Sequence, residues 1–290
     1  MRVTQGMLSN NMLRNLTNSN NQLNKYMDQL ATGKKINKPS DDPVITLKGM
    51  NYRSQVNQVE QYKRNTNELH NWMDNSDAAL DKTTQALQRI RELAVQASND
   101  TYSTDERKNI KVEAEQLKNH LVELANTKVN EKYIFNGTDT QNRPVDEDGS
   151  LLREGEPGKV EIEVFAGTQL AANVNPDKVF NEEFFGNIDQ FIDNLENNPD
   201  GIQDSISDMD RNIDQTINAR AELGARMNRL ELVENRLNEQ EVIAVSTMSK
   251  NEDVDYAETI TKLITQESLH RAALSAGSRI IQPSLLDFLR

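Results

Sequence analysis

The sequence predicts a mainly α protein: an elongated antiparallel helical bundle or coiled coil, built from both chain ends, with a small β-rich domain inserted between them. Three observations lead to this prediction. A heptad pattern occupies the first half of the chain, helical periodicity returns after Gly201, and glycine and proline are concentrated between the two regions. The helical regions flank the insertion, so they are expected to pack on each other.

The longest predicted helix runs from Val44 to Asn99. No proline occurs between Pro43 and Pro144, and a helix of this length would span about 85 Å at 1.5 Å per residue. Small and hydroxylated residues in its seam favour close packing in a multi-helix bundle over a self-sufficient dimer zipper. The seam positions alternate in steps of four and three: Tyr62, Thr66, Leu69, Met73, Ser76, Leu80, Thr83, Leu87, Ile90, Ala94 and Ala97.

The two chain ends carry apolar residues that need a partner. Residues 1–38 contain a second heptad register, Leu13, Leu16, Asn20, Leu23, Met27 and Leu30, but many asparagines make this helix marginal alone. The C-terminal region is also apolar, which is unusual for an exposed terminus. The two ends are therefore expected to pair and to drive self-assembly, through Leu13, Leu16, Leu23, Met27, Leu30, Ile260, Leu263, Leu274, Ile281, Leu285, Leu286, Phe288 and Leu289.

Local signals set the predicted helix boundaries. Asp41 or Asp42 can cap the long helix, and Pro43 suits its first position. Ser103 and Glu106 form a capping box for a shorter helix folded back on the first. After Gly201 the apolar positions are Ile202, Ile206, Met209, Ile213, Ile217, Leu223, Met227, Leu230 and Leu237, with an interruption near 251–255.

The segment between Gly137 and Gly201 has a different composition, with four of the seven prolines and seven of the twelve glycines. Val160, Ile162 and Val164 alternate with glutamates as in a half-exposed strand, and residues 174–180 could supply another. Three regions are therefore predicted. They are a terminal helical layer of residues 1–40 plus 255–290, disordered when free; a helical rod core of 41–137 plus 200–254; and a β-rich outer domain of 138–199.

Composition excludes several classes of function. The formal net charge of −13 repels nucleic acid and anionic lipid, so neither is expected as a principal partner, and no membrane association is expected. The chain has no cysteine, which removes disulfides and thiolate chemistry. The N-terminal region lacks the apolar core of a signal peptide, so the protein is expected to be cytosolic or to be exported without a cleaved signal.

Catalytic and metal-binding patterns are not found in the sequence. His70, His120 and His270 are scattered without a second ligand at metal-site spacing, and residues 146–149 resemble an incomplete calcium loop that is better interpreted as an acidic turn. No nucleophile elbow, P-loop or dinucleotide fingerprint occurs. We therefore predict no enzyme activity, no catalytic or metal residues and no cofactor.

Three stretches together resemble the flagellin superfamily. The segment Leu30 to Pro43, LATGKKINKPSDDP, is similar to the element that joins the terminal helix of flagellins to their first core helix. Gln88 to Asn99, QRIRELAVQASN, is similar to the end of that core helix. The third stretch is the tail, from Asp255 to Arg290. The insertion is not covered by the resemblance.

Within this superfamily, the motifs PSDDP at 39–43 and YIFNGT at 133–138, with the opening MRVT, look more like the members at the hook-filament junction than like filament flagellins. The Asn-Gly pair at 136–137 is flagellin-like, so a minor or divergent filament flagellin is the alternative. A cytosolic coiled-coil scaffold is a second alternative, since it would share the heptads.

The resemblance implies an extracellular structural adapter of the bacterial flagellum. It implies export as an unfolded chain through the flagellar type III apparatus, with a dedicated export chaperone as a partner. The other implied partners are further copies of the same chain in a ring, the first hook-associated protein and flagellin. In some flagellins an innate immune receptor contacts the region that matches Arg89, Leu93 and Glu113 here, although a solvated helix face with Leu93 near the seam is the favoured interpretation.

Overall fold

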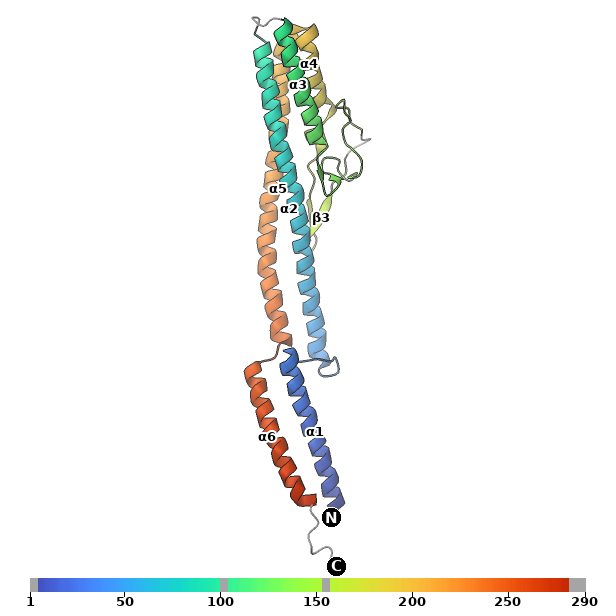
Figure 1. The fold of residues 1–290 in the computed structure, drawn as a ribbon, viewed down its shortest axis with the longest axis vertical. Coiled ribbons are helices and arrows are strands. Elements are labelled where there is room, and N and C mark those ends of the chain that lie inside the picture. The colour runs from blue at the N-terminus through green and yellow to red at the C-terminus, as the bar shows by residue number, and fades with distance from the viewer. Residues whose placement is uncertain (1–4, 100–103, 153–156, 282–290) are drawn as a thin grey trace, which may run out of the picture. The chain divides into compact units, whose positions relative to one another are not determined.

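The structure is a computed structural model that describes residues 5–99, 104–152 and 157–281. These residues form six α-helices and two small antiparallel sheets (Figure 1). The chain divides into two compact units, one made of residues 1–58 with 240–290 and the other of 59–239. The helices are α1 (Gln5–Thr32), α2 (Pro43–Ala97), α3 (Thr104–Ala125), α4 (Glu182–Asn197), α5 (Ile202–Glu252) and α6 (Tyr256–Ile281).

The mainly α prediction with a small β insertion is confirmed, and so are several predicted boundaries. Pro43 is the first residue of α2, and the Asp42 carboxylate accepts hydrogen bonds from the backbone N–H groups of Val44 and Ile45 at 3.0 and 3.1 Å. The interruption predicted near 251–255 separates α5 from α6. Ser103, the first residue of the predicted capping box, lies outside the described residues.

The predicted seam of α2 is confirmed at every position, because all the side chains from Tyr62 to Ala97 in that heptad pattern are buried. Its hydroxyl groups are satisfied within the helix. Ser76 donates to the carbonyl of Trp72 at 2.8 Å, and Thr83 donates to that of Ala79 at 2.9 Å. Small polar residues can therefore line the core without leaving a donor unpaired.

The facing helix α5 departs from its prediction at one position. Ile217 is 46% exposed, whereas its neighbour Thr216 is buried and donates to the Asn212 carbonyl at 2.8 Å. Asn212 also donates to the Phe184 carbonyl and accepts from Asn187. The prediction of a buried Ile217 is wrong because a polar network, rather than the largest apolar residue, takes the inner face at this turn.

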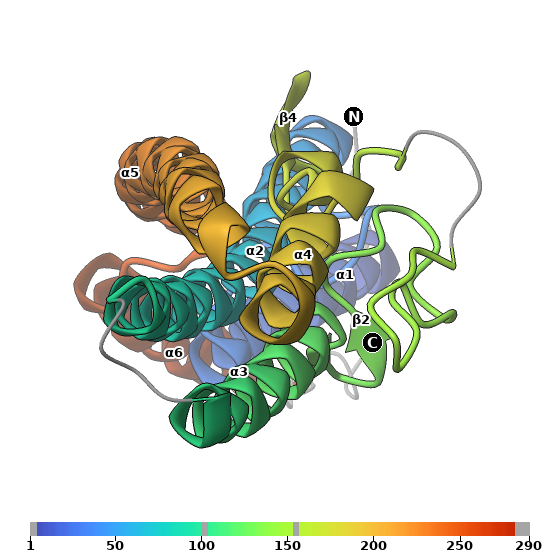
Figure 2. The same cartoon turned by 90° about the horizontal axis from the view of Figure 1, so that it is seen from above.

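In the unit of residues 59–239, α2, α3, α4 and α5 lie side by side around a common core, as seen from above in Figure 2. Side-chain ion pairs connect neighbouring helices across their exposed edges. These pairs are Arg89 with Glu113 (α2 to α3), Lys118 with Asp189 (α3 to α4), Arg211 with Glu183 (α5 to α4) and Arg91 with Asp210 (α2 to α5).

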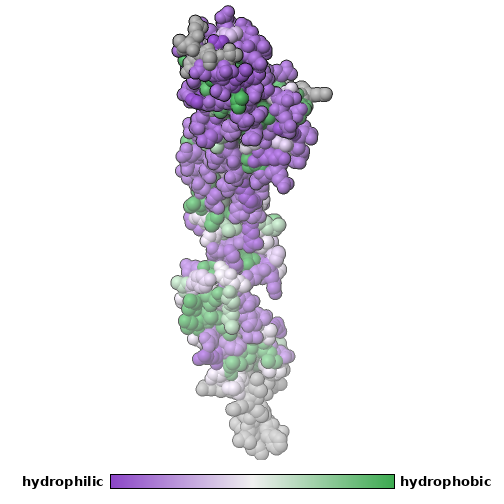
Figure 3. All heavy atoms as spheres, turned by 45° about the horizontal axis from the view of Figure 1, so that its top comes forward, coloured by the Kyte–Doolittle hydropathy of each residue, from purple (hydrophilic) through white to green (hydrophobic). Residues whose placement is uncertain are grey.

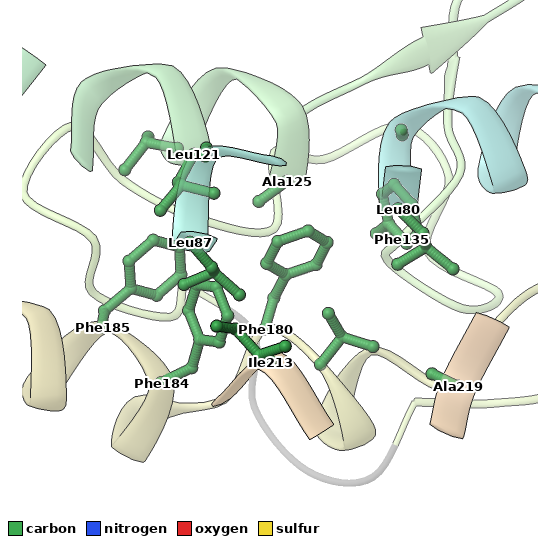
Figure 4. Close-up of a cluster of buried hydrophobic side chains, with 14 of the residues drawn as sticks. Leu80, Leu87, Leu121, Ala125, Phe135, Phe180, Phe184, Phe185, Ile213 and Ala219 are labelled. Atoms are coloured by element: carbon green, nitrogen blue, oxygen red, sulfur yellow. The ribbon is translucent and has the colours of Figure 1, made fainter. Parts of the chain in front are cut away.

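The core between these helices contains a cluster of phenylalanine rings among leucine and alanine side chains (Figure 4). Phe180, Phe184 and Phe185 make edge or stacked ring contacts with centroids 5.1 to 6.4 Å apart, and Phe135 meets Phe180 edge-on at 5.1 Å. Two of these rings belong to α4, which lies in the segment predicted to be β-rich. The helix begins after Asn181, whose side chain accepts from the Phe184 backbone N–H at 2.7 Å.

The strands are short. β1 (Lys128–Val129) pairs with β2 (Lys132–Tyr133), and β3 (Glu161–Phe165) pairs with β4 (Thr168–Ala171), both antiparallel. The strand predicted at 160–164 is therefore confirmed within one residue. The second strand predicted at 174–180 is wrong, because Pro176 begins the 3-10 helix η1 (Pro176–Lys178); a second 3-10 turn, η2 (Pro199–Gly201), precedes α5.

Candidate self-assembly surface

In the unit that contains both chain ends, α1 and α6 pack as an antiparallel pair. The Ser19 hydroxyl is 3.1 Å from the Gln266 amide nitrogen and 3.2 Å from His270 Nδ1, and Gly277 faces the end of Met12. A contact repeats every three or four residues along each helix. The half-buried or buried positions are Ser9, Met12, Leu16, Ser19, Leu23, Tyr26, Gln29 and Leu30 on α1, and Thr259, Leu263, Gln266, His270, Ala273 and Gly277 on α6.

This seam differs from the predicted heptad register at alternate positions. Leu16, Leu23 and Leu30 face α6 as predicted, but Met12, Ser19 and Tyr26 occupy the other positions in place of Leu13, Asn20 and Met27. The side of α6 that faces α1 explains the difference. It carries Gln266 and His270, which bond Ser19, and Gly277, which leaves space for Met12. Leu263 is the one predicted α6 residue in the seam.

The remaining described residues of the predicted set are exposed. Leu13, Met27, Ile260 and Leu274 have 54%, 57%, 45% and 50% of their area accessible. Ile281 is the last residue of α6, and the placement of its side chain is not described. Leu285, Leu286, Phe288 and Leu289 lie outside the described residues.

The exposed residues form one face of the pair. Leu13 and Met27 each directly follow a seam residue of α1, and Ile260, Ile264 and Leu274 each directly follow a seam residue of α6. One residue turns a helix by about 100°. In an antiparallel pair, the residue that follows a seam residue points to the same side of the pair on both helices. The five side chains therefore lie on one side of the α1/α6 pair. We call them the apolar face.

Two levels of the apolar face can be distinguished from the register of the pair. In this register Met12 lies opposite Gly277, and Ser19 lies opposite His270. Met27 is therefore at the level of Ile260 and Ile264. Leu13 is near the level of Leu274. Between the two levels the same side carries polar residues, such as Asn20 on α1 and Glu267 on α6. Exposed apolar residues are common singly, but exposed apolar side chains that gather from two helices, as they do at each level, are typical of an interaction surface. Hydrophobic patches interrupt the hydrophilic surface in Figure 3.

The connectors between the helices of this unit are held by a charged cluster that sequence reasoning missed. Lys34 forms ion pairs with Asp253 at 2.6 Å and Glu252 at 3.6 Å, and Arg53 pairs with Glu252 at 2.6 Å. Glu252 is 8% exposed, and Gly49 leaves the space for its carboxylate. We call these residues the connector cluster. The sequence signals of this cluster are the acidic pair Glu252-Asp253 at the helix interruption and the basic pair Lys34-Lys35 after Gly33.

Backbone hydrogen bonds support the connector cluster. The Lys35 N–H donates to the Glu252 carbonyl at 2.7 Å, and the Val254 N–H donates to the Gly33 carbonyl at 2.9 Å. Hydrogen bonding to Asp253 raises the pKa of Lys34, and the same bond, with one from Ser249, lowers the pKa of Asp253. Both groups are therefore held in their charged forms around neutral pH.

The other residues singled out from the sequence have structural partners. His70 Nε2 lies 3.2 Å from Glu234, and His120 Nδ1 lies 3.7 Å from Glu123. Within the described ranges no group of three potential metal ligands occurs. Residues 146–149 form a turn in which Gly149 has a φ of +88° and its N–H donates to the Asp146 carbonyl.

The proposed receptor-contact residues are separated by burial. Leu93 is 1% exposed and belongs to the core of the helical unit, whereas Arg89 and Glu113 lie on the surface and bond each other at 2.7 Å. A protein docking on this surface would meet the ion pair and not the leucine. None of the described helices is apolar over a length that could span a membrane.

Comparisons with known proteins agree on one family. The model of the bacterial flagellin N-terminal helical region matches residues 3–140, and that of the bacterial flagellin C-terminal helical region matches residues 206–289. Flagellar hook-associated protein 3 of Escherichia coli (strain K12) is 26% identical over 95% of this chain and 96% of its own length. Flagellin of Bacillus subtilis (strain 168) is 27% identical, with complete coverage of both chains.

Solved structures support the same relationship. The crystal structure of Bacillus cereus FlgL matches with a TM-score of 0.61 and 25% identity, covering 69% of this chain and 99% of that one. The fold is that of a helical protein, with a four-helix core in one unit and an antiparallel pair of terminal helices in the other. The two matched regions together cover more than half of the sequence, and the chain belongs to the bacterial flagellin superfamily. It is a structural component of the flagellum.

Proposed function

We propose that this chain is a structural adapter at the hook-filament junction, polymerised through its terminal helices. The observation that carries the proposal is the apolar face of α1 and α6, where five large side chains are 45% to 58% exposed. Burying such side chains between copies is favourable by about 25 cal/mol per Å². The whole-length similarity to flagellar hook-associated protein 3 supports the junction as the place of assembly.

The proposal includes how the chain reaches that place. It is exported unfolded by the type III apparatus without a cleaved signal peptide, held beforehand by an export chaperone, and assembled in a ring between the first hook-associated protein and flagellin. A chain without cysteine carries no disulfide that would obstruct threading. The N-terminal helix, which is rich in asparagine, gains order when neighbouring subunits bury it. In this scheme residues 1–40 plus 255–290 form the assembly layer, 41–137 plus 200–254 the rod core and 138–199 the outer domain.

A minor or divergent filament flagellin is the second candidate. The observation that favours it is the similarity to the flagellin of Bacillus subtilis. That flagellin is 27% identical to this chain, and the hook-associated protein 3 of Escherichia coli is 26% identical. Both candidates use the same apolar face. They differ in whether the protein is needed before filament growth or becomes part of the filament.

Electron microscopy of cells that lack the gene distinguishes the candidates. Loss of a junction adapter leaves hooks without filaments, and flagellin accumulates in the medium. Loss of a minor flagellin leaves filaments attached to the hooks. Filaments of normal length on the deletion strain would refute the junction role, and complementation with the wild-type gene is the control.

A further inference from the structure

A small pocket opens beside the connector cluster, where the chain enters α2. The segment after Gly33 folds against the first turns of α2 and leaves an open pocket of about 240 Å³ between them. This is enough for one bulky apolar side chain. Its apolar walls are Ile36, Pro39, Ile45 and Met50, and its polar lining includes Asn37, Lys38, Thr46, Arg53 and Glu252.

Among the described residues, Lys38 supplies an unpaired positive charge at the rim of the pocket, and the other cation of the lining, Arg53, pairs with Glu252. Lys38 is exposed and makes no ion pair with a described residue, and the Arg53 side chain is 60% accessible although it bonds Glu252. Met50, on the wall, is 64% exposed. The pocket therefore fits an apolar segment that also bears a carboxylate.

The chain has one such segment outside the described residues. Its sequence from 284 to 290 is SLLDFLR, which places Asp287 between Leu286 and Phe288. The bulky side chains fit the apolar walls, and the carboxylate complements Lys38 at the rim.

A segment of the same copy cannot reach this pocket. The pocket lies near the start of α6, and Ile281 is the last residue of that helix, about 38 Å further along its axis at 1.5 Å per residue. Phe288 is seven residues beyond Ile281, and at 3.3 to 3.6 Å per residue it reaches about 25 Å at most. Any occupancy by this segment must come from another copy.

We infer that the segment Leu285–Leu289 of one copy inserts into the pocket of a neighbouring copy, with Asp287 facing Lys38. The inference rests on the proposed self-assembly and specifies its contact. It also gives the C-terminal residues a partner that is separate from the apolar face.

Disulfide trapping tests this contact, because the natural chain has no cysteine. Met50→Cys and Phe288→Cys are introduced in separate copies that are produced together in the same cells, and isolated flagella are oxidised and run on a non-reducing gel. We expect a covalent dimer that contains one copy of each variant. The matched control replaces Met50→Cys by Leu47→Cys, since Leu47 is equally exposed at 64% on the same helix but does not line the pocket.

The expected yield with Met50→Cys is at least tenfold above that with Leu47→Cys. Equal yields, or no dimer from flagella that contain both variants, would overturn the pocket contact while leaving the proposed function intact. Absence of the wild-type protein from isolated flagella would overturn both. A double variant, Met50→Cys with Phe288→Cys in one chain, is expected to form dimers and larger chains; a closed monomer as the main product would also refute insertion between copies.

Discussion

At the scale of single residues, two glycines of this chain have opposite structural roles. Gly33 has a φ of +70°, and its carbonyl accepts the hydrogen bond from Val254 that joins the two connectors. Gly224 lies within α5 in ordinary helical conformation, with open space where a side chain would begin. The same substitution should therefore have opposite effects at the two sites.

We expect Gly33→Ala to lower the free energy of unfolding by about 1 to 2 kcal/mol, because a β-carbon is strained in the left-handed region. Gly224→Ala should raise it by about 0.4 to 1 kcal/mol, because alanine reduces the conformational entropy of the unfolded chain. Urea denaturation followed by the helical circular dichroism signal measures both. Destabilisation by Gly224→Ala equal to that by Gly33→Ala would contradict this assignment.

Residue chemistry also explains which predicted contacts differ in the structure. Choosing the largest apolar residue at each turn gave Leu13, Met27 and Ile217 as buried positions. In the structure Thr216 takes the inner position at the turn assigned to Ile217 and bonds the Asn212 carbonyl. On α1 the seam includes Ser19, which bonds Gln266 and His270, and Met12 and Tyr26 face inward in place of Leu13 and Met27. Hydrogen-bond partners from another helix cannot be identified from periodicity alone.

At the scale of elements, the connector cluster makes the stability of its unit depend on pH. Because Lys34 lowers the pKa of Asp253, the carboxylate stabilises the fold above its unfolded pKa of about 3.9, and this stabilisation is lost as the pH falls through the lower folded pKa. The pKa of Lys34 is raised, so the stabilisation that its ammonium group contributes is lost only as the pH rises into the alkaline range. The pair therefore contributes across neutral pH.

We expect Asp253→Asn to lower the midpoint of thermal unfolding at pH 7, and the difference from wild type to disappear as the pH falls below about 3. The measurement is the unfolding midpoint against pH. Asp214→Asn is the control, since Asp214 is exposed on α5 and its carboxylate forms no ion pair with a described residue. A difference that persists unchanged at pH 2 would show that the carboxylate's charge is not responsible.

The elements themselves were predictable to different degrees. The seam of α2 could be read directly because it repeats over many turns, and the capping by Asp42 follows from local chemistry. Helix α4 was missed because glycine and proline around it dominated the composition of residues 138–199. Its own signals were Asn181 as a cap and the helical spacing of Phe184, Ile188, Phe191 and Leu195.

At the scale of the whole molecule, sequence patterns predicted a helical protein with paired ends, and family resemblance predicted its place in the flagellum. The sequence alone did not give the side on which the apolar face lies or the pairing of charges in the connector cluster. Both depend on the rotation and register of α1 against α6, which are set by contacts between residues more than 200 positions apart.

The central claim is that the apolar face drives assembly, and the most direct measurement is the fraction of hooks that carry filaments when this face is changed. Ile260→Ser with Ile264→Ser removes two exposed side chains that contribute nothing to the seam, so the helical circular dichroism of the purified protein should be unchanged. Leu232→Ser, at a position 71% exposed in the other unit, is the control. We predict that the double variant reduces the fraction of hooks with filaments at least tenfold while the control retains it. Normal filaments on cells that carry only the double variant would contradict the account.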